Sequence, residues 1–317
     1  MKKVILMAVA AAFMCGCEKE LKVSGDEPEA DASGVVVNGP GKRFTFTVKG
    51  DFGSPTFADG DVQPDADASG VGAASAGRRA STYLTDGSNQ MTDLWVFDFV
   101  GETCVQSLHQ TTSDEAWGQP QMSLALGTHH IYFVASRGVT PTVNTTAKTI
   151  TWSSVRDTYW KDYEVTVVNT SNGNRAVTLD RVVAKLKLTV NDEIPTGATT
   201  LTCTPASWHY GLNYTTGAPI AATNDQAITI SVPTSYVGTI GQLSASFFTF
   251  SGADEWTTNV SLAVKDGNSN VLGSVAISDV PLKRNRSTEY SGSLFSGSSA
   301  VTVSVNGDWL SPYVGAW

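Results

Sequence analysis

The sequence is short of positive charge and of long apolar runs. Among its 317 residues, 21 are Lys or Arg and 30 are Asp or Glu, which gives a formal net charge of -9 at pH 7. Surfaces that bind nucleic acids need clustered Lys and Arg, so this composition argues against a nucleic-acid partner. After the first apolar stretch, no run is long enough to cross a membrane as a helix. An acidic composition of this kind mainly favours solubility.

Cysteine is also scarce, with four residues in the whole chain. Cys15 and Cys17 fall in the N-terminal segment, so Cys104 and Cys203 are the ones left for the folded body. Two cysteines in an exported protein could form a disulfide, but these two are far apart in the sequence and fall in different predicted domains. We therefore expect two buried free thiols rather than a disulfide.

Motifs of catalytic and cofactor sites are missing as well. The chain has no G-x-S-x-G nucleophile elbow, and the glycine-rich stretch at 70–77 follows no predicted strand. His129 and His130 are adjacent on a predicted strand and should point to opposite faces, which suits packed or exposed histidines better than metal ligands. The acidic stretch at 59–70 has Pro64 where a calcium loop needs its turn glycine, so a solvated linker is favoured. The sequence predicts no enzyme, no cofactor and no metal site.

The N-terminus has the pattern of a lipoprotein signal peptide. Two lysines precede an apolar core at residues 4–13, which is too short for a transmembrane helix. The tetrad MCGC at 14–17 resembles the lipobox of bacterial lipoproteins, in which the last cysteine receives the lipid; the alternative is an ordinary signal peptide. We expect residues 1–16 to be the signal peptide and Cys17 to carry several acyl chains, which anchor a protein stably. Residues 17–42 hold too few large apolar side chains to fold alone and are predicted to be a flexible tether.

One well-patterned strand and a long linker follow the tether. The stretch RFTFTVKGDF at 43–52 alternates strictly, with Phe44, Phe46 and Val48 on one face and polar residues on the other. This pattern predicts a half-buried strand. Residues 53–79 consist mainly of Gly, Ala, Asp, Ser and Pro and form a connection longer than compact domains usually use. A linker of this length is usually functional or disordered.

The chain from residue 80 onward is predicted to be β throughout. Its segments are short, rich in β-branched and aromatic residues, and bounded by Gly, Asn, Asp, Ser or Pro. Clean alternation starts again at VVAKLKLTV, 182–190, which favours a domain boundary just before it. We therefore expect an all-β fold of two tandem β-sandwich domains, at 43–180 and 181–317. Only the stretch at 153–162 favours a short helix.

The eight tryptophans offer a competing hypothesis. Exposed aromatic side chains on β-sandwiches stack on sugars, and five tryptophans fall near predicted strand ends or loops. The alternative, which we favour, is that they pack in the core or between domains. Trp95, between Leu94 and Val96, is expected in the core. The five candidates for a sugar platform are Trp117, Trp152, Trp160, Trp208 and Trp256.

Several motifs together resemble the fimbrillin family, the lipoprotein-derived pilus subunits and related surface proteins of Bacteroidales. The resemblance covers nearly the whole chain. It implies two transthyretin-like, Greek-key β-sandwich domains, and a lipidated precursor from which an arginine-specific protease removes the N-terminal segment with its first strand. The motifs that carry it are the lipobox, the isolated first strand, GRRAS at 77–81, QMTDLWVFDFVGE at 90–102, LDRVVAKLKLTV at 179–190, VPLKRNRSTEYSGSLF at 280–295 and the C-terminal Trp317.

The same resemblance places the processing site at Arg79-Ala80, at the end of the linker. Cleavage between Arg78 and Arg79 is the next alternative, and both arginines could instead be solvated linker charges. Small polar residues in an unpacked linker are where proteolysis concentrates. The strand at 43–52 would then be detachable, and the groove that it leaves would accept a strand from another subunit.

The C-terminal stretch WLSPYVGAW, 309–317, is a candidate donor strand, because it follows a turn-forming Asn-Gly-Asp. The same residues could equally close their own domain. The candidates are Trp309, Leu310, Tyr313, Val314 and Trp317.

The sequence therefore predicts a structural subunit of a cell-surface fimbria, exported as an outer-membrane surface lipoprotein. Its expected partners are other fimbrial subunits through β-strand addition, the outer membrane through the lipid, and a host or bacterial surface ligand. The alternative is an adhesive or glycan-binding surface lipoprotein that does not polymerise.

Overall fold

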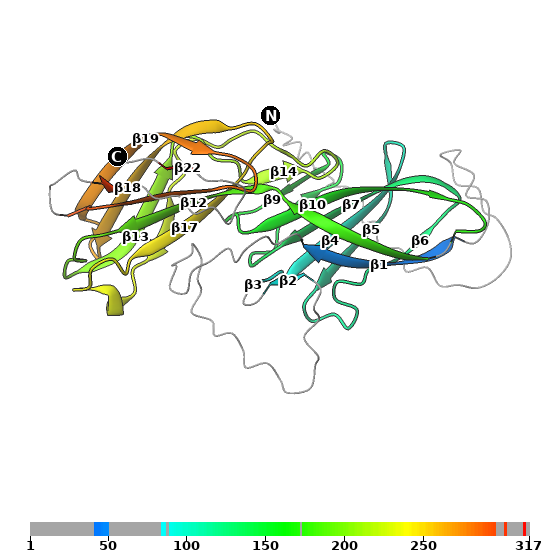
Figure 1. The fold of residues 1–317 in the computed structure, drawn as a ribbon, viewed down its shortest axis with the longest axis horizontal. Coiled ribbons are helices and arrows are strands. Elements are labelled where there is room, and N and C mark those ends of the chain that lie inside the picture. Colours follow the sequence, from blue (N-terminus) through cyan, green and yellow to red (C-terminus); the bar gives the residue numbers. More distant parts are fainter. Residues whose placement is uncertain are drawn as a thin grey trace, which may run out of the picture. The chain divides into compact units, whose positions relative to one another are not determined.

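The computed structural model describes residues 41–50, 84–86, 89–171, 173–295, 301–302 and 313–314, which are β-strands and their connections (Figure 1). Within these ranges the helical structure is one short 3-10 turn, Thr234–Tyr236. The described part of the chain contains no helix long and apolar enough to cross a membrane. The predicted all-β fold is confirmed.

The first sandwich is built from one seven-stranded sheet in the order β5-β4-β7-β10-β11-β1-β6. The strands β10 and β11 pair only at Tyr159–Arg181 and Trp160–Asp180. Beyond this point the sheet divides, and residues of β1, β6 and β11 pack in one buried cluster with residues of β4, β7 and β10. The strands are β1 (Lys42–Gly50), β4 (Asp93–Val100), β5 (Thr103–Thr111), β6 (Gln121–Leu124), β7 (Gly127–Ser136), β10 (Thr158–Val167) and β11 (Asn174–Arg181).

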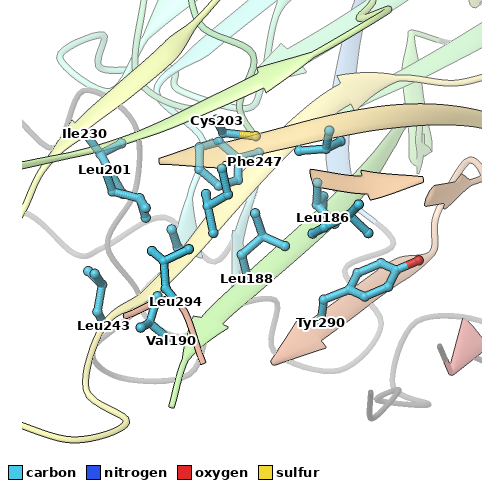
Figure 2. Packing of buried hydrophobic residues seen from close by; sticks show 14 of the residues in the cluster. Leu186, Leu188, Val190, Leu201, Cys203, Ile230, Leu243, Phe247, Tyr290 and Leu294 are labelled. Atoms are coloured by element: carbon cyan, nitrogen blue, oxygen red, sulfur yellow. The ribbon is translucent and has the colours of Figure 1, made fainter. Parts of the chain in front are cut away.

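The second sandwich has two separate sheets. One has the order β17-β12-β20, with β21 (Val301–Thr302) and β22 (Tyr313–Val314) pairing along β20, and the other has the order β16-β13-β18-β19. Between them lies a core in which Leu186 and Leu188 of β12 meet Leu201 and Phe247 (Figure 2). The remaining strands are β12 (Val183–Val190), β13 (Ala198–Pro205), β16 (Ile228–Ser231), β17 (Ser244–Phe250), β18 (Trp256–Asp266), β19 (Val271–Leu282) and β20 (Ser287–Gly292).

The two sandwiches repeat one strand arrangement. In chain order, β1, β4, β5, β6, β7, β10 and β11 correspond to β12, β13, β16, β17, β18, β19 and β20. The order β5-β4-β7-β10 becomes β16-β13-β18-β19, and β6-β1-β11 becomes β17-β12-β20. In both sandwiches the first strand pairs in parallel with the last, and the other corresponding pairs are antiparallel. The strand β12 is therefore the counterpart of β1.

Two additional hairpins join the sandwiches, which belong to one compact unit, Gly41–Trp317. They are β8 (Thr142–Asn144) with β9 (Thr149–Thr151) and β14 (Gly211–Asn213) with β15 (Ala218–Pro219), and they share a sheet through an antiparallel pair between β9 and β14. Tyr214 stacks on Phe97 of the first sandwich with ring centroids 4.1 Å apart. A third buried cluster of aromatic and aliphatic side chains surrounds this contact. A further short hairpin pairs β2 (Thr85–Asp86) with β3 (Asn89–Gln90).

Two local expectations were wrong. The stretch at 153–162 does not form a helix: β10 begins at Thr158, because its alternating side chains fit the ladder with β7. Trp95 is not in a sandwich core, since the buried Leu94 and Val96 on either side point inward and leave the indole on the other face of β4. There it is half-buried against the third cluster and stacks on His109, with centroids 3.9 Å apart.

The two cysteines of the folded body are free. Cys203 is buried in the second core, and burial raises the pKa of its thiol. Cys104 is only half-buried, so the expectation of two buried thiols holds for Cys203 alone.

Candidate functional site

The first strand, β1, is held along both of its edges. It pairs in parallel with β11, from Thr45 opposite Asn174 to Gly50 opposite Leu179, and antiparallel with β6 at its N-terminal half. Past the end of β6, the segment before it continues the ladder: the N–H of Phe46 donates to Pro120 O at 3.0 Å and that of Val48 to Gly118 O at 2.9 Å. The strand is thus an interior strand, although it comes first in the chain.

The inner face of β1 is fully buried. Phe44, Phe46 and Val48 are each 0% exposed, which confirms the alternation expected from the sequence. The ring of Phe46 makes edge contacts with Phe133 and Tyr163, with centroids 5.4 Å and 5.9 Å apart. Burying an apolar side chain of this size contributes roughly 1.5–3 kcal/mol. The three side chains together therefore contribute an amount comparable with the net stability of a whole domain.

The N-terminal end of β1 is fixed by close contacts. The guanidinium of Arg175 lies over the ring of Phe44, 5.2 Å from its centroid. Gly173 approaches the strand so closely that a Cβ there would lie 2.1 Å from the carbonyl oxygen of Arg43, so only glycine fits. Its own carbonyl accepts the N–H of Thr45 at 2.5 Å. A cation over an aromatic ring is attracted to the face of that ring, so this contact helps to hold Phe44 in place.

The neighbouring strand β6 depends on β1. Among the described residues β1 is its one strand partner, because β6 is the last strand of the sheet. Its other attachments are the buried side chains of Met122 and Leu124 and a contact at its C-terminal end. There His129 Nε2 lies 3.1 Å from Ala125 O, while Nδ1 lies 2.8 Å from Asp98 Oδ1. Both nitrogens of this buried imidazole face acceptors, which favours the doubly protonated form.

The stability of the folded protein is expected to fall as pH rises because of His129. The hydrogen bond with Asp98 raises the pKa of His129 above its ordinary value. A raised folded-state pKa contributes stability that is fully present below the unfolded value of about 6.5 and is lost as pH rises through the folded value. Urea unfolding across this range should show a downward slope that His129→Gln reduces. An identical slope in parent and variant would contradict the assignment.

Most other predicted site residues lie outside the described part of the chain. This holds for Cys17, for Arg79 and Ala80, and for Trp309, Leu310 and Trp317. The backbone of Tyr313 and Val314 is described and pairs in parallel with Thr288 and Glu289 of β20. This two-residue pairing is within the chain itself, as in the self-closing alternative for the tail.

The tryptophans proposed for a sugar platform are buried or half-buried against the hydrophobic clusters. Trp117, Trp152 and Trp208 are buried, and Trp208 Nε1 donates to Phe248 O at 2.9 Å. Trp160 and Trp256 are half-buried, each against one of the hydrophobic clusters. The favoured interpretation, packing in the core or between sandwiches, therefore describes all five.

Sequence reasoning missed the partners of β1 and two inward-facing arginines, the half-buried Arg175 and the buried Arg181. The neighbours β6 and β11 lie far from β1 in the sequence, and pairing over such distances has no local signal. A local signal does exist for Arg175 and Arg181. They fall at inward positions of a strand whose other inward residues are Val177 and Leu179. A cation on the apolar face of an alternating strand predicts a buried partner.

A family of unknown function, DUF6562, matches residues 131–316. No curated protein matches the sequence. A structure of a candidate adhesin from Bacteroides ovatus ATCC 8483 has 12% identity and a TM-score of 0.46, covering 80% of this chain and 88% of that one. Candidate polysaccharide-binding proteins from Bacteroides thetaiotaomicron VPI-5482 have 11% identity and a TM-score of 0.47, over 87% and 98% of the two chains. A fimbrial assembly protein from Parabacteroides distasonis ATCC 8503 has 13% identity and a TM-score of 0.45, over 87% and 99%. The family match begins within β7 and leaves β1 outside it.

Proposed function

The chain belongs to DUF6562, a family of unknown function, and we propose that this protein is a structural subunit of a cell-surface fimbria. It is exported as an outer-membrane lipoprotein and assembles when its first strand is removed and replaced by a strand of another subunit. The observation that carries the proposal is the combination of the fully buried inner face of β1 with the long, polar connection that follows it in the sequence. Size-exclusion chromatography before and after cleavage by an arginine-specific protease tests it.

The comparison of the two sandwiches supports a special role for β1. Its counterpart β12 has the same kinds of neighbours and is followed by β13 after only residues 191–197. The strand arrangement itself therefore does not require a long connection after the first strand. In the first sandwich, residues 53–79 alone form a longer segment of mostly small and polar residues. A long connection that the fold does not require is consistent with a segment that serves as a site of proteolytic cleavage.

Cleavage at the end of this linker changes how β1 is held. An intact linker keeps the strand at a high effective concentration beside its groove, whereas a cut strand is a separate peptide that dilution can remove. The free groove exposes the apolar surface beneath Phe44, Phe46 and Val48 and leaves β6 without a strand partner. A strand from another chain restores both the burial and the backbone hydrogen bonds.

The geometry of the groove defines what can enter it. The occupant runs parallel to β11 and antiparallel to β6, and it presents apolar side chains at three alternating positions. An aromatic residue suits the first of these, where Arg175 covers Phe44. The C-terminal stretch 309–317 is the proposed donor. In the free subunit its described residues, Tyr313 and Val314, pair with Thr288 and Glu289 of β20, and donation to another subunit would replace this pairing.

The lipid anchor is proposed to be Cys17. We expect Cys17→Ala to release the protein from the membrane fraction and to abolish metabolic labelling with palmitate, because a thioether can form only at that sulfur. The matched control is Cys15→Ala, which should change neither. Labelling that persists in Cys17→Ala would refute the assignment. Since Cys17 precedes Arg79, cleavage would also separate the body from its anchor, and assembled subunits would be held by one another.

The other partners follow from this role. A surface subunit is expected to meet a host or bacterial ligand in addition to its own kind. The alternative, a surface adhesin that does not polymerise, shares the anchor and the location but predicts that cleavage leaves the protein monomeric.

A further inference from the structure

The strand β19 (Val271–Leu282) is a long edge strand of the second sandwich. Among the described residues its one strand partner is β18, so its other edge presents backbone N–H and C=O groups. Such an edge is a template for an incoming strand unless the protein protects it. The usual protections are charges, proline, bulges and short length.

Residues 271–278 of this edge have the sequence VLGSVAIS and carry no charge or proline. Their pairing with β18 is regular from Gly273 to Ile277, and the register shifts on either side of this stretch. Its outward side chains, Ser274, Ala276 and Ser278, are small and exposed. The opposite face packs on the core through Val275 and Ile277. The exposed edge is therefore uncharged and is anchored to the core on its inner face, and its regular stretch is short.

Both ends of this segment are fixed. Before it, Asp266 accepts the backbone N–H groups of Asn268 and Asn270 at 2.9 Å and 2.8 Å and closes the turn. After it, Asp279 has a positive φ of 53°, and its N–H donates to Asn259 Oδ1 at 3.0 Å. An extended segment held at both ends loses little further conformational freedom on pairing.

The corresponding edge of the first sandwich is protected. Its strand, β10, is the counterpart of β19 and carries Lys161, Asp162 and Glu164. Lys161 Nζ pairs with Asp180 Oδ2 at 2.8 Å, and His130 Nδ1 lies 3.2 Å from Asp162 Oδ1. The equivalent edge strands of the two sandwiches therefore differ in charge, which is one of the features that prevent an incoming strand from pairing.

We propose that β19 is an interaction surface that pairs with β19 of a second copy of this chain, antiparallel and about a two-fold axis. Charge favours this occupant. The chain is acidic, with a net charge of -9, so most contacts between copies oppose like charges. When residues 271–278 of two copies pair, no like charges within these segments lie opposite one another. A two-fold axis also lets each copy use the same surface for the contact.

The pairing lies on the second sandwich and needs neither cleavage nor the groove of β1. It joins subunits side by side, and it can be tested without strand exchange. The test uses the chain with Arg78→Lys and Arg79→Lys, which removes both arginines of the proposed processing site, and Cys17→Ala, which removes the lipid site. A dimer of this protein cannot come from strand replacement at β1.

Light scattering over a range of concentrations should show a monomer–dimer equilibrium, and amide hydrogen exchange within 271–278 should slow as the dimer forms. Ala276→Lys should raise the midpoint concentration of the monomer–dimer equilibrium by about tenfold or more. The two-fold axis would place one lysine from each copy in the same short ladder, where the two positive charges repel each other. The matched control is Ser261→Lys. Ser261 is exposed, is the cross-strand partner of Ala276, and lies on the interior strand β18.

Circular dichroism and the thermal midpoint verify that both variants fold, and Ser274→Lys replaces Ala276→Lys if that variant does not. A parent that stays monomeric at all concentrations overturns the proposal. A dimer that Ser261→Lys weakens as much as Ala276→Lys overturns it as well, because the contact would then use the sheet face instead of the edge.

Discussion

Cleavage after Arg79 is expected to turn the uncleaved protein into a series of detergent-resistant polymers. Before cleavage, β1 fills its own groove, with Phe44, Phe46 and Val48 fully buried. After cleavage the strand is a peptide that competes with strands of other subunits, and its removal forfeits burial of roughly 1.5–3 kcal/mol for each side chain. Replacement by a tethered strand of a neighbour, bound by a whole ladder of hydrogen bonds, is the stable outcome.

The uncuttable variant Arg78→Lys/Arg79→Lys keeps both positive charges and is the matched control. After protease treatment it should form no detergent-resistant polymers and nothing larger than the dimer through β19, as judged by size-exclusion chromatography and by electrophoresis of unheated samples. Deleting 309–317 should give a folded protein that is cut normally but cannot donate and so does not polymerise with itself. Mixed with cleaved parent, it should act as a chain terminator, because its groove still accepts a strand.

A competing peptide examines the groove directly. Excess KRFTFTVKG, residues 42–50, should suppress polymerisation of the cleaved protein, since it is the native occupant of the groove. The same peptide with aspartate in place of Phe44 and Phe46 should not, because a carboxylate cannot be buried there without a partner. Polymers formed equally well by the uncuttable variant would refute strand replacement. Normal polymerisation of the tail deletion would refute only the donor and would assign 309–317 to the edge of its own sandwich.

The strands of the fold could be predicted where one face is buried and the other is not. In β1 the strict alternation of aromatic and polar residues was enough to name the buried side chains, because each successive side chain points to the opposite face. The same rule, applied fully, would have placed Trp95 correctly: if Leu94 and Val96 face the core, the residue between them does not. The error came from taking hydrophobic neighbours as evidence of a shared environment.

Other features depend on contacts between distant segments. The hairpins β8–β9 and β14–β15 have strands of two or three residues, too short for any periodicity to be visible. They are ordered by pairing with each other and by the stacking of Tyr214 on Phe97. The stretch at 153–162 had local features of a helix, and the ladder with β7 decided otherwise. Tertiary pairing of this kind overrides local preference.

Asp157→Ala is expected to destabilise the fold by about 3–5 kcal/mol, because it removes the carboxylate that forms an ion pair with the buried guanidinium of Arg181. The guanidinium donates from Nε to Asp157 Oδ1 at 2.8 Å and from Nη2 to Oδ2 at 3.1 Å, and the two side chains are 1% and 0% exposed. Tyr159 lies beneath, with its ring centroid 4.9 Å from the guanidinium carbon. Nη1 donates to Asn285 Oδ1 at 3.1 Å, which links the end of β11 to the turn before β20.

The ion pair between Lys161 and Asp180 is the control, because Asp180 adjoins Arg181 on the same strand but is exposed. Asp180→Ala should cost no more than about 1 kcal/mol, as surface pairs do. Urea unfolding followed by tryptophan fluorescence measures both. The double variant Asp157→Ala/Arg181→Met should recover part of the loss, since it removes the unpaired charge that makes the single variant costly. If Asp157→Ala lowers the free energy of unfolding no more than Asp180→Ala does, the prediction is wrong. Water would then reach Arg181 in the folded protein, and the junction between the sandwiches would be hydrated at this ion pair.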